Sequence, residues 1–120
     1  LRIGAKGVHA ERLSHDPEHW EDVRQDPLNH NKISIRYLHE VITMGEYAME
    51  NVSRLNIPFL LIHGDADEIT SHKASEELVA NISGTAKLKI WEGLRHELHN
   101  EFEQKEVFRY VKDWILGLQL

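Results

Sequence analysis

The sequence predicts an α/β fold in which two parallel strands are joined by a crossover helix. An apolar run at 59–63, bounded by Pro58 and Gly64, has the length of a strand. A helical pattern follows it, and a second strand pattern comes at 87–91. Strands joined in this order run in the same direction, because the helix brings the chain back to the same end of the sheet.

The elements before the first strand are expected to be helical. Residues 1–13 show no clear periodicity, which predicts a loop or a frayed end. Asp16 and Pro17 then suit the cap and the first position of a short helix. Apolar residues at three- and four-residue steps predict a long helix over 33–53. Gly45 inside it costs about 1 kcal/mol relative to Ala, which suggests close packing or a bend.

The second half alternates strands and helices. The run at 59–63 is apolar almost throughout, as in a strand buried on both faces. Thr70 or Ser71 can cap the crossover helix, and Gly84 is placed to end it in the left-handed conformation. A last helix is expected over 103–118. Its apolar face consists of Val107, Val111, Trp114, Ile115 and Leu118.

Only two strands are predicted, and a two-stranded parallel sheet leaves its edges open. Most independent domains have more strands than this. We therefore expect the chain to pair with a further segment that carries the rest of a sheet, or to self-associate through its strand edges.

Composition narrows the class of protein. The chain has 120 residues, with 14 Lys and Arg against 20 Asp and Glu, and a formal net charge of −6. An acidic chain without basic clusters is not expected to bind nucleic acid. Cysteine is absent, so thiolate and disulfide chemistry are excluded. No transmembrane stretch or signal peptide is predicted, and the expected location is the cytoplasm.

Each predicted strand is followed by a loop that contains a residue of a type common in active sites. Asp67 follows the first strand and His96 follows the second. Loops after two parallel strands emerge at the same edge of the sheet, where open α/β sheets usually place their sites. An Asp that orients an imidazole is two-thirds of a nucleophile–His–acid triad. Asp65 is a local rival of Asp67, and one of the two is expected to serve the turn itself.

The order and spacing of these residues resemble a known family. PFLLIHGDADEI (58–69) and KLKIWEGLRHELHNE (87–101) are similar to the C-terminal part of α/β-hydrolases of the monoacylglycerol lipase/lysophospholipase-like group, the serine aminopeptidase S33 hydrolases. LSHDPEHWEDVRQDPLNHNKIS (13–34) resembles the segment that leaves the family's cap. The resemblance implies Asp67 as the acid in G-x-x-D and His96 as the base in G-x-x-H, in the order Ser…Asp…His.

The resemblance also implies a division of the chain. Residues 1–55 correspond to a cap-exit helical segment, and residues 56–120 to the C-terminal βαβα part of the hydrolase core. The family's G-x-S-x-G elbow occurs nowhere in the 120 residues. The serines lack its flanking glycines; they stand at positions 14, 34, 53, 71, 75 and 83. We therefore expect a C-terminal fragment that is inactive alone, whose parent hydrolyses lipid-like carboxylic esters without a cofactor.

Other readings of these residues stay open. His96, His99 and Glu101 could hold zinc, but H-E-x-x-H is absent, and Glu101 is better placed to serve the N-terminus of the last helix. His63 either stands near the site or only ends the strand. A set of cap residues could line an acyl pocket or simply pack; it consists of Trp20, Tyr37, Met44, Tyr47 and Met49.

Two further classes of function remain alongside the esterase. One is a non-catalytic or partner-dependent α/β module that binds another chain through its open sheet edge. The other is a different α/β-hydrolase activity, such as a peptidase, haloperoxidase or thioesterase. All of these enzymes share the Asp and the His, so the nucleophile, which this sequence does not contain, would separate them.

Overall fold

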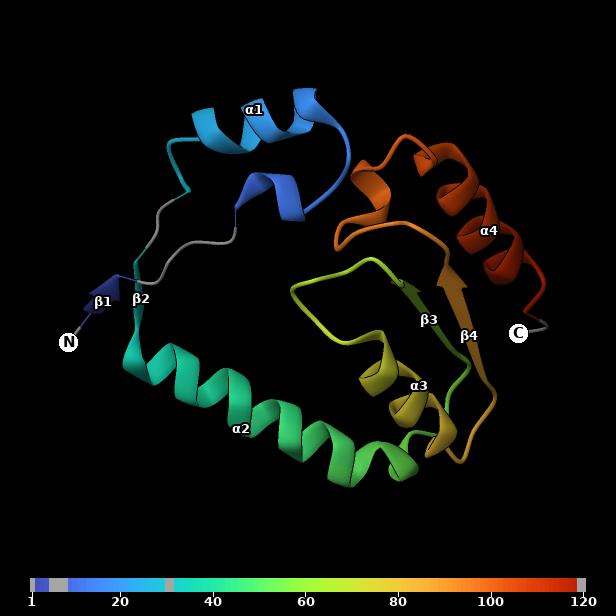
Figure 1. Ribbon diagram of the computed structural model, residues 1–120. Helices are drawn as coiled ribbons and strands as arrows, with labels where there is room; N and C mark the ends of the chain where they lie inside the picture. Colours follow the sequence, from blue (N-terminus) through green and yellow to red (C-terminus); the bar gives the residue numbers. More distant parts are fainter. Residues whose placement is uncertain (1, 5–8, 30–31, 119–120) are drawn as a thin grey trace.

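The computed structural model describes residues 2–4, 9–29 and 32–118. Figure 1 shows a curved arrangement in which the long helix α2 lies apart from the paired strands β3 and β4. The elements occur in the order β1 (Arg2–Gly4), η1 (Ala10–Arg12), α1 (Pro17–Gln25), β2 (Lys32–Ser34), α2 (Ile35–Asn51), η2 (Val52–Arg54), β3 (Phe59–Gly64), α3 (His72–Ala80), β4 (Ala86–Trp91), η3 (Leu98–Asn100) and α4 (Gln104–Leu116).

The parallel βαβ unit is confirmed. Strands β3 and β4 pair in parallel with Leu61 opposite Leu88, and α3 packs against both of them. Ser71 caps α3 by accepting a hydrogen bond from the backbone N–H of Ala74 at 3.4 Å. The loops that follow β3 and β4 therefore leave the sheet at the same edge, as the sequence predicts.

Several expectations about single elements were wrong. A short antiparallel ribbon of β1 and β2 adds two strands, because three-residue strands are too short to show a period in the sequence. The predicted long helix is confirmed as α2, although it begins at Ile35, where Ser34 caps it, and not at residue 33. Helix α3 ends at Ala80, and Gly84 has no left-handed backbone. An added Cβ at Gly84 would lie 3.1 Å from the carbonyl oxygen of Leu55, so Gly84 allows close packing instead.

Burial also differs from the prediction. Residues 59–63 are only half-buried. Helix α3 packs against the strands, and Val107 of α4 belongs to the cluster that Ile62 and Trp91 contact, but these contacts leave the strand partly exposed. The buried core lies at the end of the strands instead. Its buried members Leu94, Leu98 and Val107 pack with Ile62 and Trp91. The core thus supports the loop after β4, where His96 lies.

Helix α2 presents large apolar side chains to solvent. Leu38 is 42% exposed and Tyr37 is 60% exposed, and the rest of the stripe lies within this range: Ile35, Val41, Ile42, Met44 and Tyr47. A contiguous apolar surface of this kind usually faces another element or molecule. None of the described helices is both long and apolar enough to cross a membrane.

Gly64 ends β3 where the backbone of the loop after β4 lies against it. A Cβ at Gly64 would lie 2.1 Å from the carbonyl oxygen of Leu94 and 2.6 Å from that of Arg95. Both obstacles are backbone atoms, so a side chain could be accommodated only by moving the His96 loop. At Gly45, in contrast, an added Cβ would have no described neighbour within 4 Å.

We predict opposite effects for the same substitution at these two glycines. Gly64→Ala should lower the free energy of unfolding by about 3 kcal/mol, because it overpacks a backbone contact. Gly45→Ala should raise it by up to about 1 kcal/mol, because alanine is the better helix former on an exposed helix. Urea unfolding followed by tryptophan fluorescence measures both. Equal stability of the two variants would contradict the close approach of the loops.

Candidate active site

Asp65 and Gly93 join the loops that follow β3 and β4. Oδ1 of Asp65 accepts a hydrogen bond from the backbone N–H of Gly93 at 2.6 Å. The backbone N–H of Ala66 donates to the carbonyl of Leu94 at 3.0 Å. Gly93 has a φ of 74°, a left-handed conformation that favours glycine. Asp65 therefore has a structural role in holding the two loops side by side.

Asp67 is buried and receives five hydrogen bonds. Its side chain is only 2% exposed. Oδ1 accepts from the backbone N–H groups of Ile69 at 2.7 Å and Thr70 at 3.0 Å. Oδ2 accepts from the Thr70 hydroxyl at 2.6 Å and lies 2.8 Å from Nδ1 of His96 and 3.0 Å from Nε2 of His63. These partners fix the carboxylate in one orientation.

The surroundings of Asp67 favour its charged form. Burial by itself raises the pKa of Asp67, but hydrogen bonds from the Thr70 hydroxyl, from His96 and from the backbone N–H groups of Thr70 and Ile69 outweigh it. The pKa of Asp67 therefore lies well below its usual range. Asp67 is a carboxylate at every pH near neutrality and can stabilise a cation beside it.

His96 combines a fixed nitrogen with a free one. A carboxylate can only accept hydrogen bonds, so Nδ1 of His96 carries the proton that is shared with Asp67. The His96 side chain is 34% exposed. Nothing in the described part of the chain forms a hydrogen bond with its Nε2. This tautomer leaves Nε2 with a lone pair facing outward, which is what a general base requires.

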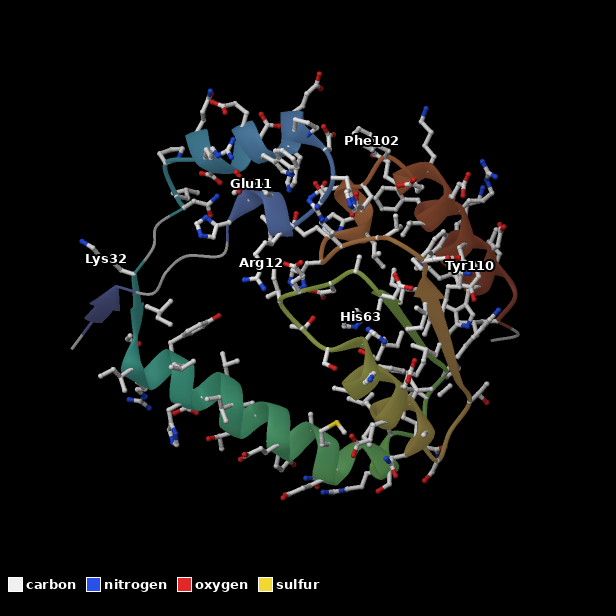
Figure 2. The ribbon with its side chains drawn as sticks, viewed as in Figure 1. Glu11, Arg12, Lys32, His63, Phe102 and Tyr110 are labelled. Atoms are coloured by element: carbon white, nitrogen blue, oxygen red, sulfur yellow. The ribbon has the colours of Figure 1, made fainter. Side chains whose placement is uncertain are left out.

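His63 also belongs to this site, although its place in the sequence indicated no definite role. It stands at the end of β3 and points toward the loop between β3 and α3, as Figure 2 shows. Its Nε2 contacts Asp67, and its Nδ1 lies 2.7 Å from the hydroxyl of Ser75 on α3. The only signal in the sequence was a polar side chain at the end of an apolar strand.

Glu101 is fully buried, and its carboxylate does not serve the N-terminus of α4, which corrects the sequence prediction. Its carboxylate accepts from the backbone N–H of Arg95 at 2.7 Å and from that of His15 at 2.8 Å, and the His15 ring lies 3.1 Å away. Arg95 in turn donates to the carbonyl of Ser14 at 2.9 Å. Glu101 therefore ties the His96 loop to the segment before α1, which the sequence did not indicate.

The segment around η1 makes further contacts with the site loops. Figure 2 shows Arg12 reaching from η1 toward the loop after β3, where its Nε lies 3.2 Å from Oε2 of Glu68. At the other loop, Nε2 of His19 lies 2.7 Å from Oε2 of Glu97. Both catalytic-type residues are thus flanked by contacts with the first quarter of the chain.

The metal hypothesis gains no support from the geometry. Within residues 2–4, 9–29 and 32–118, no group of three or more His, Cys, Asp or Glu side chains is arranged so that it could hold a metal ion. His99 is exposed on η3, whereas the carboxylate of Glu101 is turned inward to His15 and Arg95.

The suggested acyl-pocket residues do not form one site. Trp20 donates its indole N–H to the carbonyl of Ser14 at 2.8 Å and so serves packing. Tyr37 and Met44 are exposed on α2, and Met49 is half-buried. Tyr47 lines an open groove of about 460 Å³, whose other lining residues are Ala48, Asn51, Val52, Arg54, Leu55, Phe59 and Leu78. None of these residues belongs to the Asp67–His96 pair.

Comparison with known proteins identifies the family. The family model described as "Serine aminopeptidase, S33" matches residues 2–103. The chain belongs to this serine aminopeptidase S33 family. It is 33% identical over 117 residues to a monoacylglycerol lipase of Mycolicibacterium smegmatis, which covers 96% of this chain and 42% of that protein. It is 29% identical over 105 residues to a caffeoylshikimate esterase of Arabidopsis thaliana, and this match covers 83% of this chain and 32% of that protein.

Solved structures of the same kind share the fold. The crystal structure of a monoacylglycerol lipase from Paleococcus ferrophilus superimposes with a TM-score of 0.90 at 26% identity, covering 98% of this chain and 46% of that one. The chain therefore has the fold of one part of an α/β-hydrolase, and it spans less than half the length of these relatives. The predictions of the fold class and of the S33 resemblance are confirmed.

The acid dependence of stability should reveal Asp67. Because folding depresses the pKa of Asp67, its interactions contribute stability that is present above its unfolded value of 3.8 and is lost as the pH falls through the folded value. Asp67→Asn should lower the free energy of unfolding at pH 7. The difference in this free energy between the variant and the wild type should become smaller below about pH 4. Chemical denaturation at pH 7, 4 and 3 measures this. The exposed Asp113→Asn is the control, and a difference that does not vary with pH would contradict the assignment.

Removal of Glu101 should cost more stability than removal of an exposed glutamate. Glu101→Ala leaves the backbone N–H groups of His15 and Arg95 without their acceptor and should lower the free energy of unfolding by about 3 kcal/mol. Glu103→Ala should change it by less than about 0.5 kcal/mol, because Glu103 is exposed and makes no capping bond. Thermal or urea unfolding distinguishes the two. Equal losses would contradict the anchoring role of Glu101.

Proposed function

We propose that this chain supplies the acid and the base of a serine hydrolase that cleaves carboxylic esters of the monoacylglycerol or lysophospholipid type. The observation that carries the proposal is the 2.8 Å contact between Oδ2 of Asp67 and Nδ1 of His96, which leaves Nε2 of His96 facing outward. The nucleophilic serine and the oxyanion donors come from polypeptide outside these 120 residues, because no G-x-S-x-G stands within them.

The residues of the pair act in sequence. Nε2 of His96 takes the proton of the serine hydroxyl as its oxygen attacks the ester carbonyl, and Asp67 stabilises the imidazolium that forms. His96 then returns the proton to the leaving alcohol as the tetrahedral intermediate collapses to the acyl-enzyme. Water, activated by His96 in the same way, then attacks the acyl-enzyme and releases the carboxylic acid product. The scheme uses no cofactor and no metal ion.

Ester substrates are favoured over peptides by the relatives. The family is named for an aminopeptidase, but the similar proteins described above are named as monoacylglycerol lipases and as a caffeoylshikimate esterase. The proposed substrates are therefore small lipid-like esters, and a peptidase or thioesterase activity is the runner-up.

The exposed surfaces favour a larger assembly. The apolar stripe of α2 and the edges of the two-stranded β3–β4 sheet would be covered in a complete α/β-hydrolase. We propose that the polypeptide that carries the serine, or a second copy of this chain, covers them. A non-catalytic module that uses these surfaces only for binding is the alternative that the activity test excludes or supports.

Activity of the native-length gene product tests the proposal. It should hydrolyse a monoacylglycerol, and Asp67→Asn and His96→Ala should each lower kcat by about 10⁴-fold. His99→Ala, which removes an exposed histidine three residues from His96, should leave kcat within about threefold, since such surface changes are mild. Retention of activity in His96→Ala would refute the role of the base. Faster cleavage of an aminoacyl peptide than of the ester would favour the peptidase.

A further inference from the structure

A second imidazole holds the same carboxylate oxygen that His96 uses. Nε2 of His63 lies 3.0 Å from Oδ2 of Asp67, and Nδ1 of His96 lies 2.8 Å from the same atom. His63 is mostly buried, with 13% of its side chain exposed. It comes from β3 and not from the acid loop, so it links the carboxylate directly to the sheet.

The hydrogen-bond pattern fixes the tautomer of His63. The Asp67 carboxylate can only accept, so Nε2 of His63 carries the proton. Its Nδ1 then accepts the hydroxyl proton of Ser75, which lies 2.7 Å away on α3. The result is a chain of contacts from Ser75 through His63 and Asp67 to His96. It ties the orientation of the acid to both β3 and α3.

Sharing one oxygen between two imidazoles has an electrostatic consequence. The N–H group of His63 and the Thr70 hydroxyl both donate hydrogen bonds to Oδ2. These bonds partly neutralise the negative charge that Oδ2 presents to His96. An acid restrained in this way stabilises the imidazolium of His96 without trapping it, so His96 can pass its proton on to the leaving group. The ionisable groups that face His63 are Asp67 from the acid loop, His72 from α3 at 6.5 Å between ring centroids, and, beyond Asp67, His96.

We propose that His63 is a positioning residue for the catalytic acid, and that the Ser75 hydroxyl holds the His63 ring in place through Nδ1. This inference rests on the proposed function, because it concerns the same Asp67–His96 pair. It adds a residue that acts on the reaction through Asp67 and does not itself touch the substrate.

Two substitutions of His63 separate positioning from packing. His63→Gln can keep an N–H donor near Oδ2 of Asp67, whereas His63→Leu fills similar space without a donor. Both should be made in the native-length gene product, with active sites counted by fluorophosphonate titration so that misfolded protein does not affect kcat. Urea unfolding of each variant reports stability separately.

We expect kcat to fall when the side chain at position 63 has no N–H donor, and to be largely kept when it has one. His63→Leu should lower kcat per active site about tenfold with KM unchanged, and His63→Gln should stay within about threefold of wild type. The acid limb of the kcat/KM profile should move to higher pH in His63→Leu only. Without the His63 N–H, the Asp67 carboxylate interacts more strongly with His96 and so favours its protonated form. Ser75→Ala should lower kcat about threefold, and the exposed Ser83→Ala should leave it unchanged.

Three outcomes would overturn the inference. His63→Leu could keep the wild-type kcat and pH profile, or His63→Gln could lose as much as His63→Leu, which would assign His63 to packing. The third is retained activity in Asp67→Asn and His96→Ala, which would refute the proposed function together with this inference. Loss of activity in those two variants, with no effect of His63→Leu, would refute only the inference.

Discussion

The hydrogen bond between Asp67 and His96 depends on the parallel pairing of β3 and β4. Parallel strands place their following loops at one edge, and that placement brings together two residues that are 29 positions apart in the sequence. Gly64 lets the loops approach to backbone contact, and Asp65 and Gly93 join them by a hydrogen bond. The direction of the strands therefore brings Asp67 and His96 together, and the contacts of Gly64, Asp65 and Gly93 hold their two loops in place.

Much of the rigidity around this pair comes from buried polar groups and not from a large apolar core. The buried apolar cluster consists of Leu94, Leu98 and Val107 beneath the His96 loop. Around it, Asp67 and Glu101 are almost or completely buried, and each has its oxygens occupied by several donors. Such groups are costly when a donor is missing and rigid when all are satisfied. This explains how a small sheet with partly exposed strands can hold a site in a defined geometry.

Local spacing and strand direction predicted the βαβ unit, the cap at Asp16 and a cap at Thr70 or Ser71, of which the structure shows Ser71. They also predicted that the loops carrying Asp67 and His96 meet, and the family resemblance selected Asp67 over Asp65. The sequence did not predict the β1–β2 ribbon, whose strands are too short to show a period. The inward turn of Glu101 was also missed, and whether His63 stands near the site was left open. Both depend on contacts across the fold, which no pattern of neighbouring residues records.

A crystal structure of the native-length gene product after reaction with a fluorophosphonate would test the central claim most directly. The account predicts a single labelled serine, outside these 120 residues, with its Oγ about 3 Å from Nε2 of His96. The contact between Nδ1 of His96 and Asp67 should be retained in that structure. A labelled serine remote from His96, or a native product in which no serine reacts, would contradict the assignment of this chain as the source of the acid and the base.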